Sequence, residues 1–166
     1  DKDGFIDNIY GANFLNNSGN VYDDAGHGTH VSGIIAAAAN NGHGGVGLAP
    51  GSKIMALKVL DASGNGSLNA AVKAIRYAVD HGAKVINASW TMGIGSPSLQ
   101  SAISYAASKN VVFVTAAGNE GANNDYVPSY PGAYHYSNVL TVGAVDTSGK
   151  LASFSNYGAS SVDIAA

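Results

Sequence analysis

The chain has 166 residues, of which 46% are hydrophobic and 11% are charged, and its formal net charge is −3. This composition indicates a folded globular domain and excludes a disordered tail. Eight basic residues against 11 acidic ones leave no basic excess for nucleic acid or an anionic membrane surface. The chain has no cysteine, which excludes disulfide bonds and thiolate zinc sites.

Length and termini bear on domain organisation. A chain of 166 residues suits one domain, and we expect residues 1–166 to form it. No signal peptide and no apolar run of transmembrane length is found in the sequence. The chain starts at Asp1 without a methionine and stops within a pattern at Ala166, so we expect a processed or excised piece.

The first 20 residues contain an acidic opening and a short strand. Carboxylates alternate around Gly4 in residues 1–7, but the glutamate that ends an EF-hand loop is absent. A solvated acidic turn is therefore favoured over a cation site. Residues 10–15 are typical of a short strand, and residues 16–20 are typical of a polar turn.

Residues 23–33, with the sequence DDAGHGTHVSG, lead from a polar loop into a run of small apolar residues typical of a helix. The glycines beside His27 leave its imidazole accessible at the helix start, so His27 is a catalytic candidate. Two alternatives are a pair of structural histidines and a metal-binding pair of His27 and His30. The metal pair needs further ligands, and no HExxH-like spacing supplies them.

A glycine-rich loop follows this helix at residues 40–47. It lies between a predicted helix and a predicted strand, which is the reverse of the order in a dinucleotide-binding turn. A nucleotide-binding domain is therefore disfavoured.

The remaining elements alternate between strands and helices. Apolar runs predict strands at residues 54–60, 85–89, 111–116 and 139–145, and residues 61–67 form a turn. Helical spacing predicts one helix from Leu68 to Val79, stopped by Gly82, and the Ser96–Pro97 pair predicts a second helix over residues 99–110. This alternation predicts an α/β fold with a parallel sheet covered on both faces.

Two predicted strands end in polar residues. Ser89 and Trp90 end one strand, and Asn119 follows the small residues after another. Ligands of parallel sheets bind at the carboxyl ends of strands, so the residues at both strand ends are candidates for a ligand-binding site.

Two motifs carry a resemblance to a known family. Residues 27–33 resemble the histidine motif of the subtilisin-like serine proteases (subtilases, peptidase family S8), which reads His-Gly-Thr-His-Val-x-Gly. Residues 116–121, AAGNEG, resemble the subtilase segment that carries the oxyanion-hole asparagine. Segments at residues 130–134, 142–146 and 162–166 follow the family's order, so the resemblance covers nearly the whole chain. It implies a three-layer subtilisin-like fold, truncated at both ends, with a mostly parallel sheet flanked by helices.

The resemblance implies catalytic roles for two residues. His27 corresponds to the general base, and Asn119 corresponds to the donor that binds the oxyanion of the tetrahedral intermediate. The family's Asp-Thr/Ser-Gly and Gly-Thr-Ser-Met-Ala segments, which carry the triad aspartate and serine, are not found in this sequence. Asp23 and Asp24 belong to the loop before His27 and are not assigned to the triad. We therefore expect the chain alone to be inactive.

The resemblance also implies a substrate site. Residues 64–67 and 89–93 correspond to the two segments between which subtilases bind an extended peptide as an added strand. Small residues from Ala116 to Gly118 correspond to a roomy, apolar primary pocket with Glu120 at its rim. Trp90 corresponds to the cap of an outer subsite, and a core tryptophan is the alternative. The substrate-binding candidates are Gly64, Asn65, Gly66, Ser89, Trp90, Gly93, Ala116, Ala117, Gly118 and Glu120.

Calcium is the cofactor that the resemblance implies. The family's tight site maps onto the carbonyl oxygens of Ala39, His43 and Gly45 and the side chain of Asn41. Alternate carbonyls suit a hard cation, since glycines let the backbone curl around it. A weaker cation site of some relatives maps onto the carbonyls of Gly132, Tyr134 and Val139.

We therefore expect a piece of a secreted, calcium-stabilised serine endopeptidase whose substrate is exposed, extended polypeptide. Neither nucleic acid nor a membrane is an expected partner. A non-catalytic subtilase-like module that binds peptides or assembles with partners is the alternative. Because the family's aspartate strand is missing from the sequence, we also expect self-association through exposed sheet edges.

Overall fold

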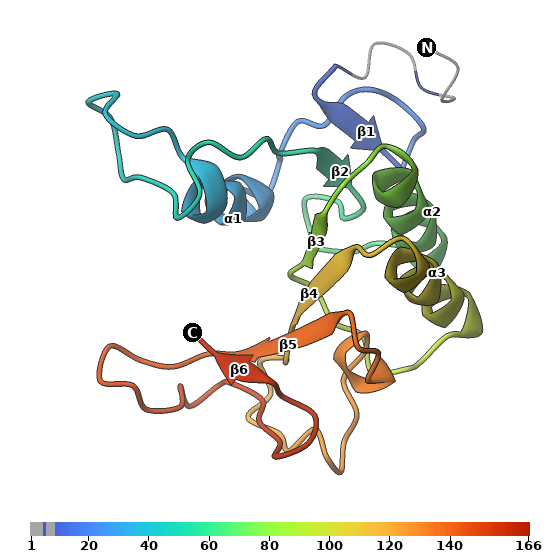
Figure 1. Ribbon diagram of the computed structural model, residues 1–166, viewed down its shortest axis with the longest axis vertical. Coiled ribbons are helices and arrows are strands. Elements are labelled where there is room, and N and C mark those ends of the chain that lie inside the picture. Colours follow the sequence, from blue (N-terminus) through green and yellow to red (C-terminus); the bar gives the residue numbers. More distant parts are fainter. Residues whose placement is uncertain (1–4, 6–8) are drawn as a thin grey trace. The chain divides into compact units, whose positions relative to one another are not determined.

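The structure, a computed structural model, describes Phe5 and residues 9–166 (Figure 1). The acidic opening at residues 1–7 thus lies, apart from Phe5, outside the described residues. The chain divides into two compact units, Asp1–Ala74 and Ile75–Ala166. Its elements are β1 (Gly11–Asn13), α1 (His27–Ala36), β2 (Ala56–Lys58), α2 (Leu68–Asp80), β3 (Val85–Ala88), α3 (Pro97–Ser108), β4 (Val112–Ala116), the 3-10 helix η1 (Gly132–Tyr134), β5 (Val139–Gly143) and β6 (Ile164–Ala165).

The first unit contains a two-stranded parallel sheet in which Gly11 of β1 lies opposite Ala56 of β2. Gly11 has a φ of 143°, and a Cβ atom there would collide with the Ala56 carbonyl group, so this close approach requires glycine. The polar turn predicted after β1 is confirmed. The Asn13 side chain closes it by accepting a hydrogen bond from the Leu15 amide (2.9 Å) and donating one to the Asn20 carbonyl (2.9 Å).

The second unit contains a four-stranded sheet in the order β3–β4–β5–β6, with every neighbouring pair parallel. Phe113 of β4 is fully buried in this unit's core, whereas Val112 of the same strand is 42% exposed. The parallel α/β fold expected from the alternation of strands and helices is confirmed. Two short elements, η1 and β6, lie where the sequence indicated none.

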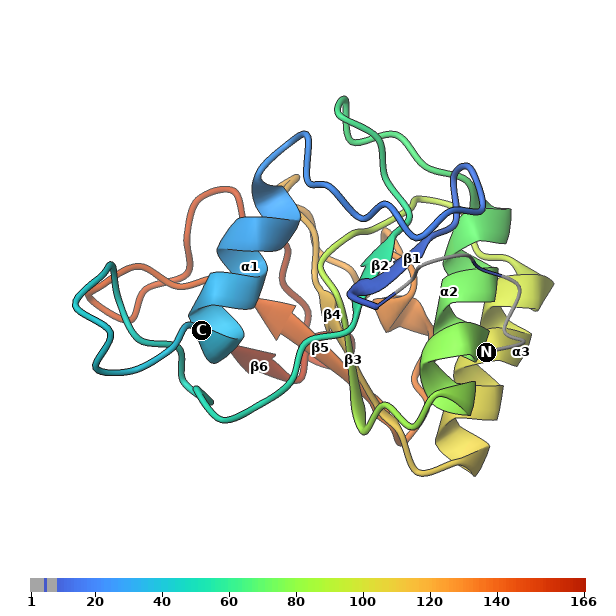
Figure 2. The same cartoon turned by 90° about the horizontal axis from the view of Figure 1, so that it is seen from above.

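Helix α3 packs through one apolar stripe, because Leu99, Ala102, Ile103 and Ala106 are all fully buried. Val79 near the end of α2 joins Ala106 and Val111 in one cluster, so the second half of α2 lies beside α3 (Figure 2). The spacing of three and four residues in α3 is what a helix with one buried face requires.

The start of α3 differs in detail from the prediction. The helix begins at Pro97 and ends at Ser108, two residues earlier at each end than expected. Ser96 is the N-cap residue, as the Ser–Pro pair indicated, but its hydroxyl group makes no capping bond and lies 2.9 Å from the Ser98 hydroxyl. Instead, the Tyr134 hydroxyl contacts the Ser96 backbone, a contact that no local sequence pattern predicts.

Among the described residues, no helix is both long and apolar enough to cross a membrane.

Candidate active site

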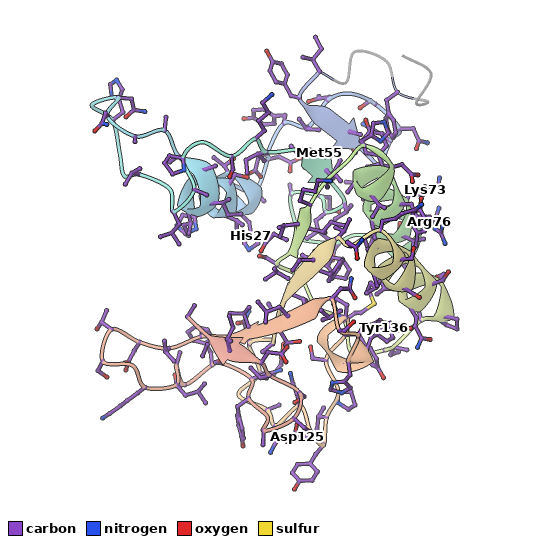
Figure 3. The ribbon with its side chains drawn as sticks, in the orientation of Figure 1. His27, Met55, Lys73, Arg76, Asp125 and Tyr136 are labelled. Carbon is purple, nitrogen blue, oxygen red and sulfur yellow. The ribbon has the colours of Figure 1, made fainter. Side chains whose placement is uncertain are left out.

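His27 is the first residue of α1 and is exposed (Figure 3). The N-cap residue, Gly26, adopts a left-handed conformation with a φ of 83° and has no side chain with which to cap the helix. Asp23 supplies the cap instead. Its Oδ2 atom accepts hydrogen bonds from the Thr29 amide (2.7 Å) and the Thr29 hydroxyl (2.6 Å), and its Oδ1 atom accepts one from the Gly26 amide (2.8 Å). The imidazole thus stands on a helix start held by a carboxylate.

This bonding has an electrostatic consequence for Asp23. The Thr29 hydroxyl, followed by the amides of Thr29 and Gly26, holds the pKa of the Asp23 carboxyl well below its usual range. Asp23 is therefore ionised throughout the neutral range and complements the positive end of the α1 dipole.

The neighbouring Asp24 binds a different element of the first unit. Its Oδ1 atom lies 2.7 Å from the Lys58 ammonium group at the end of β2, and the Lys58 side chain is 14% exposed. This ion pair explains why one lysine interrupts an otherwise apolar strand. Both aspartates before His27 therefore have structural partners, Asp23 in the loop and helix start and Asp24 at the end of β2.

Asn119 lies just beyond the carboxyl end of β4, where parallel sheets place ligand sites. The strand ends at Ala116, and Gly118 then turns the chain with a φ of 117°, which favours glycine. Asn119 is exposed, and its backbone amide donates to the Glu120 carboxylate (3.0 Å). The Glu120 side chain thus folds back onto its own loop.

The predicted primary-pocket segment is buried at Ala117 and Gly118 and half-buried at Ala116. The Ala117 amide continues the sheet by donating to the Val142 carbonyl (2.8 Å), and the Ala117 carbonyl accepts from the side chains of Asn124 (2.8 Å) and Asn156 (3.2 Å). The backbone of this segment is therefore fixed by partners that are distant in sequence.

Asn156 is a residue that motif analysis passed over. No motif of the sequence analysis includes it, yet its side chain contacts the loop that carries Asn119. A buried asparagine in a turn has no local sequence signal, since its partners are set by the fold.

The two predicted peptide-binding segments lie in different units. In the first unit, Gly64, Asn65 and Gly66 form an exposed turn closed by Asp61, which accepts hydrogen bonds from the amides of Ser63 and Asn65 (both 2.9 Å). In the second unit, Ser89, Trp90 and Gly93 follow β3, and Met92 forms an antiparallel bridge with Tyr130. Trp90 is half-buried.

The first candidate cation loop is exposed from Ala39 to Gly45. Its backbone curls through left-handed conformations at Asn40 (φ 57°), Gly42 (φ 74°) and Gly44 (φ 55°). The Asn41 side chain accepts a hydrogen bond from the His43 amide (3.0 Å). This curl suits alternate carbonyl ligands, but the donors are all neutral, and the described residues contain no group of three or more histidine or carboxylate side chains able to hold a metal.

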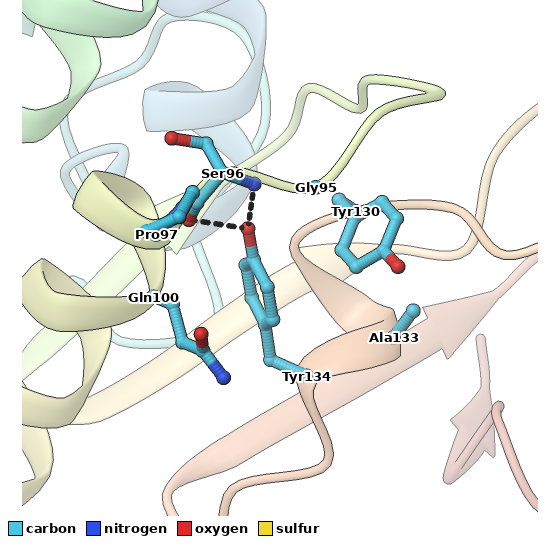
Figure 4. Close-up of a pocket in the computed structure, with 7 residues that line it drawn as sticks. All are labelled: Gly95, Ser96, Pro97, Gln100, Tyr130, Ala133 and Tyr134. Atoms are coloured by element: carbon cyan, nitrogen blue, oxygen red, sulfur yellow. Dashed lines mark hydrogen bonds between the residues drawn. The ribbon is translucent and has the colours of Figure 1, made fainter.

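The second candidate cation residues lie around η1. Gly132 and Tyr134 belong to this 3-10 helix, and Val139 is the first residue of β5. Tyr134 also lines a pocket with Ser96, Gln100 and Tyr130 beside the start of α3 (Figure 4). The Gly132 carbonyl accepts a hydrogen bond from the His135 amide (3.4 Å).

His27 belongs to the first unit and Asn119 to the second, so the common active site that the family resemblance implies for them stays a prediction. Within its own unit, each residue is exposed: His27 lies at the start of α1, and Asn119 lies beyond the end of β4.

Comparisons with known proteins agree on one family. The sequence model of the subtilase family matches residues 1–166. The chain is 44% identical over 158 residues to a thermophilic serine proteinase of Bacillus sp. (strain AK1), an alignment that covers 95% of the chain and 38% of that protein. It is also 44% identical over 158 residues to thermitase of Thermoactinomyces vulgaris, with 95% of the chain and 54% of thermitase covered.

A third relative is Subtilisin Savinase of Lederbergia lenta, which is 43% identical over 153 residues, with 90% of the chain and 53% of that protein covered. The chain thus spans between 38% and 54% of the length of these three relatives.

Proposed function

This chain belongs to the subtilase family, and from that premise we propose that the whole protein is a serine endopeptidase in which His27 is the general base and Asn119 binds the oxyanion. The observation that carries the proposal is the 44% identity to a thermophilic serine proteinase over 95% of the chain, which includes both motifs. Fold alone would not support an activity, because one fold hosts many chemistries.

The proposed reaction is acyl transfer from the peptide bond to a serine hydroxyl and then to water. The His27 imidazole accepts the serine proton as the hydroxyl oxygen attacks the carbonyl carbon, and it returns that proton to the leaving amine. The serine and the carboxylate that orients His27 come, in this proposal, from parts of the protein outside these 166 residues. The 166-residue chain alone is expected to be inactive.

Asn119 contributes where negative charge develops. As the carbonyl oxygen becomes an oxyanion, the Asn119 carboxamide donates an N–H hydrogen bond to it, which stabilises the transition state more than the ground state. Its exposure beyond the end of β4 and the fixed backbone on both sides of it support this role.

The proposed substrate is an extended polypeptide. It pairs as an added strand with the turn at residues 64–66 and the segment at residues 89–93, and Trp90 caps an outer subsite. One side chain enters a pocket lined by Ala116, Ala117 and Gly118, whose small side chains leave room for a large residue. Because the Glu120 carboxylate already accepts hydrogen bonds from the Asn119 amide and from the Asn156 side chain, we expect it to favour basic side chains only weakly.

Calcium binding is proposed for the loop at residues 39–45. The carbonyls of Ala39, His43 and Gly45 and the Asn41 side-chain oxygen would supply neutral oxygen ligands, which calcium accepts. The residues Gly132, Tyr134 and Val139 are proposed as a weaker second set. Bound calcium would hold the loop against unfolding. Secretion of the whole protein is proposed on the family resemblance.

The test of the proposed function compares variants of the whole protein on a chromogenic peptide. Asn119→Ala should lower kcat by about 10²–10³, a figure measured in subtilisin, a member of this family. His27→Ala should lower kcat by about 10⁶, again the subtilisin value. His135→Asn is the control, because His135 is an exposed histidine with a φ of 49° that asparagine tolerates. Unchanged turnover in either test variant would refute the proposal.

A further inference from the structure

The side chain of Asn156 is almost completely buried, with 2% of its surface exposed. It makes four hydrogen bonds, all to the segment at residues 117–122. Its Oδ1 atom accepts from the amides of Glu120 (2.9 Å) and Ala122 (3.0 Å). Its Nδ2 atom donates to the Ala117 carbonyl (3.2 Å) and the Glu120 carboxylate (2.8 Å). These bonds use the full donor and acceptor capacity of a carboxamide.

The backbone around Asn156 is bonded to the same segment. The Asn156 amide donates to the Gly118 carbonyl (3.0 Å), and the Tyr157 amide donates to the Ala122 carbonyl (3.0 Å). In return, the Gly121 amide donates to the Phe154 carbonyl (2.8 Å). The loop on either side of Asn119 is therefore tied to residues 154–157 by backbone bonds as well as by one side chain.

The approach of Asn156 explains the glycine before Asn119. A Cβ atom at position 118 would collide with the Asn156 carboxamide and would lie 2.6 Å from the Glu120 carboxylate oxygen. Gly118 also has a φ of 117°, where side chains are strained. The loop thus has the one residue type that lets Asn156 enter it.

The backbone of Asn156 is itself held by the neighbouring Ser155 hydroxyl. The Ser155 hydroxyl donates to the Asn156 carbonyl (2.9 Å) and accepts from the Ala144 amide (2.8 Å), just after β5. Ser155 is 2% exposed. This chain of bonds connects the end of a sheet strand to the loop that carries Asn119.

A carboxylate oxygen of Glu120 connects the Asn156 side chain to the Asn119 backbone. The Glu120 Oε2 atom accepts from both the Asn156 Nδ2 group (2.8 Å) and the Asn119 backbone amide (3.0 Å). The backbone of Asn119 is therefore separated from the Asn156 carboxamide by a single carboxylate oxygen.

We propose that Asn156 is a positioning residue for the oxyanion donor: its buried carboxamide fixes the loop at residues 117–122 so that the Asn119 side chain points where the oxyanion forms. This rests on the proposed function. Asn156 does not touch the reacting atoms, and it acts through the Glu120 carboxylate and the loop backbone. Rigid placement matters because a misplacement of about 1 Å can cost about a hundredfold in rate.

The sharpest variant is Asn156→Asp in the whole protein. It preserves shape and the oxygen that accepts from the Glu120 and Ala122 amides, but it removes both Nδ2 donor bonds and places a carboxylate against that of Glu120. The matched control is Asn138→Asp, because Asn138 lies in the same unit and its Nδ2 group donates to the Val111 carbonyl (3.0 Å), away from the loop.

We expect Asn156→Asp to lower kcat by about tenfold to a hundredfold with KM changed less than about threefold, since the ground state makes little use of the oxyanion donor. Asn138→Asp should leave kcat within about twofold of the unchanged protein. Active-site titration with an acylating reagent corrects each rate for the folded fraction. Asn156→Ser, a smaller uncharged change, replaces Asn156→Asp if the latter does not fold.

A double-mutant cycle separates positioning from general damage. In an Asn119→Ala background, the Asn156 change should cost almost nothing further, because its effect passes through a side chain already removed. The inference would be overturned if the loss of kcat in the double variant equalled the product of the losses in the two single variants. Equal kcat in the Asn156 and Asn138 variants would also overturn it. If Asn119→Ala itself leaves kcat unchanged, the proposed function fails instead.

Discussion

At the scale of single residues, carboxylate side chains stabilise loops by accepting several hydrogen bonds from one turn. Asp125 is the clearest case in the second unit (Figure 3). It accepts hydrogen bonds from the Ala159 amide (2.8 Å), from the amide and hydroxyl of Ser160 (3.2 and 2.9 Å), and from the Ser161 hydroxyl (2.7 Å). One exposed side chain thus holds a turn more than 30 residues further along the chain.

This bonding makes the turn sensitive to acid. The Ser161 hydroxyl, with further bonds from Ser160 and Ala159, lowers the pKa of Asp125 from 3.8 to about 2. Because the folded-state pKa lies below the unfolded value, the carboxylate stabilises the fold fully above about pH 4. That contribution is lost as the pH falls from about 4 to about 2.

We predict that amide hydrogen exchange at Ala159 accelerates, relative to its intrinsic rate, as the pH is lowered through this window. Asp125→Asn cannot ionise, so in this variant the protection of Ala159 should be lower at neutral pH and should no longer change between pH 4 and pH 2. Hydrogen exchange measured by mass spectrometry checks both statements. Identical pH profiles in the two proteins would show that Asp125 does not hold the turn.

At the scale of elements, the start of α3 is anchored by a tyrosine from another segment. The Tyr134 hydroxyl accepts a hydrogen bond from the Ser96 amide (2.7 Å) and donates one to the Ser96 carbonyl (3.0 Å) (Figure 4). Tyr134 belongs to η1, so this pair of bonds joins two elements that are far apart in sequence. It anchors the backbone of the N-cap residue, whose own side chain makes no capping bond.

We predict that Tyr134→Phe lowers the free energy of unfolding by about 1–2 kcal/mol, because the half-buried backbone groups of Ser96 lose their partner while the ring packing is retained. Urea unfolding measures the change, and faster hydrogen exchange at the Ser96 amide would locate it. Tyr136→Phe is the matched control, since its half-buried ring lies near that of Tyr134 (centroids 6.5 Å apart). Equal effects of the two changes would contradict the anchoring role.

At the scale of the whole molecule, the four-stranded sheet has an edge strand that bears on whether the 166-residue chain self-associates. Strand β3 pairs with β4 on one side and, within the described residues, has no strand on its other side. Val85 on this edge strand is 57% exposed. An exposed apolar edge strand is a template for pairing with another chain.

We therefore predict that the 166-residue chain self-associates through β3 and that Val85→Lys shifts it toward the monomer, since lysine on an edge opposes strand pairing. Ile94→Lys is the control, because Ile94 is 82% exposed and lies outside the sheet. Light scattering over a concentration series measures the mass. A strictly monomeric chain, or an equal response to the two changes, would rule out edge pairing as the cause.

The sequence by itself determined the type and order of most elements, since these depend on local chemistry. The helical spacing from Leu68 to Val79 predicted α2, and the Ser96–Pro97 pair predicted the start of α3. The apolar run at residues 111–116 predicted a parallel strand, and β4 is that strand, although Val112 within it is 42% exposed. The motifs around His27 and Asn119 indicated the family, because they depend on residue identity at fixed spacing.

The tertiary structure alone decided which groups hold these residues in place. Asn156 binds a loop that lies 34 to 39 residues earlier, Asp125 binds a turn 34 to 36 residues later, and Tyr134 binds the backbone 38 residues earlier. Such partners are chosen by how strands and turns come together, and the free energy of each bond depends on burial that exists only after folding. Periodicity and turn propensity act over a few residues, so they specify elements but not these long-range bonds.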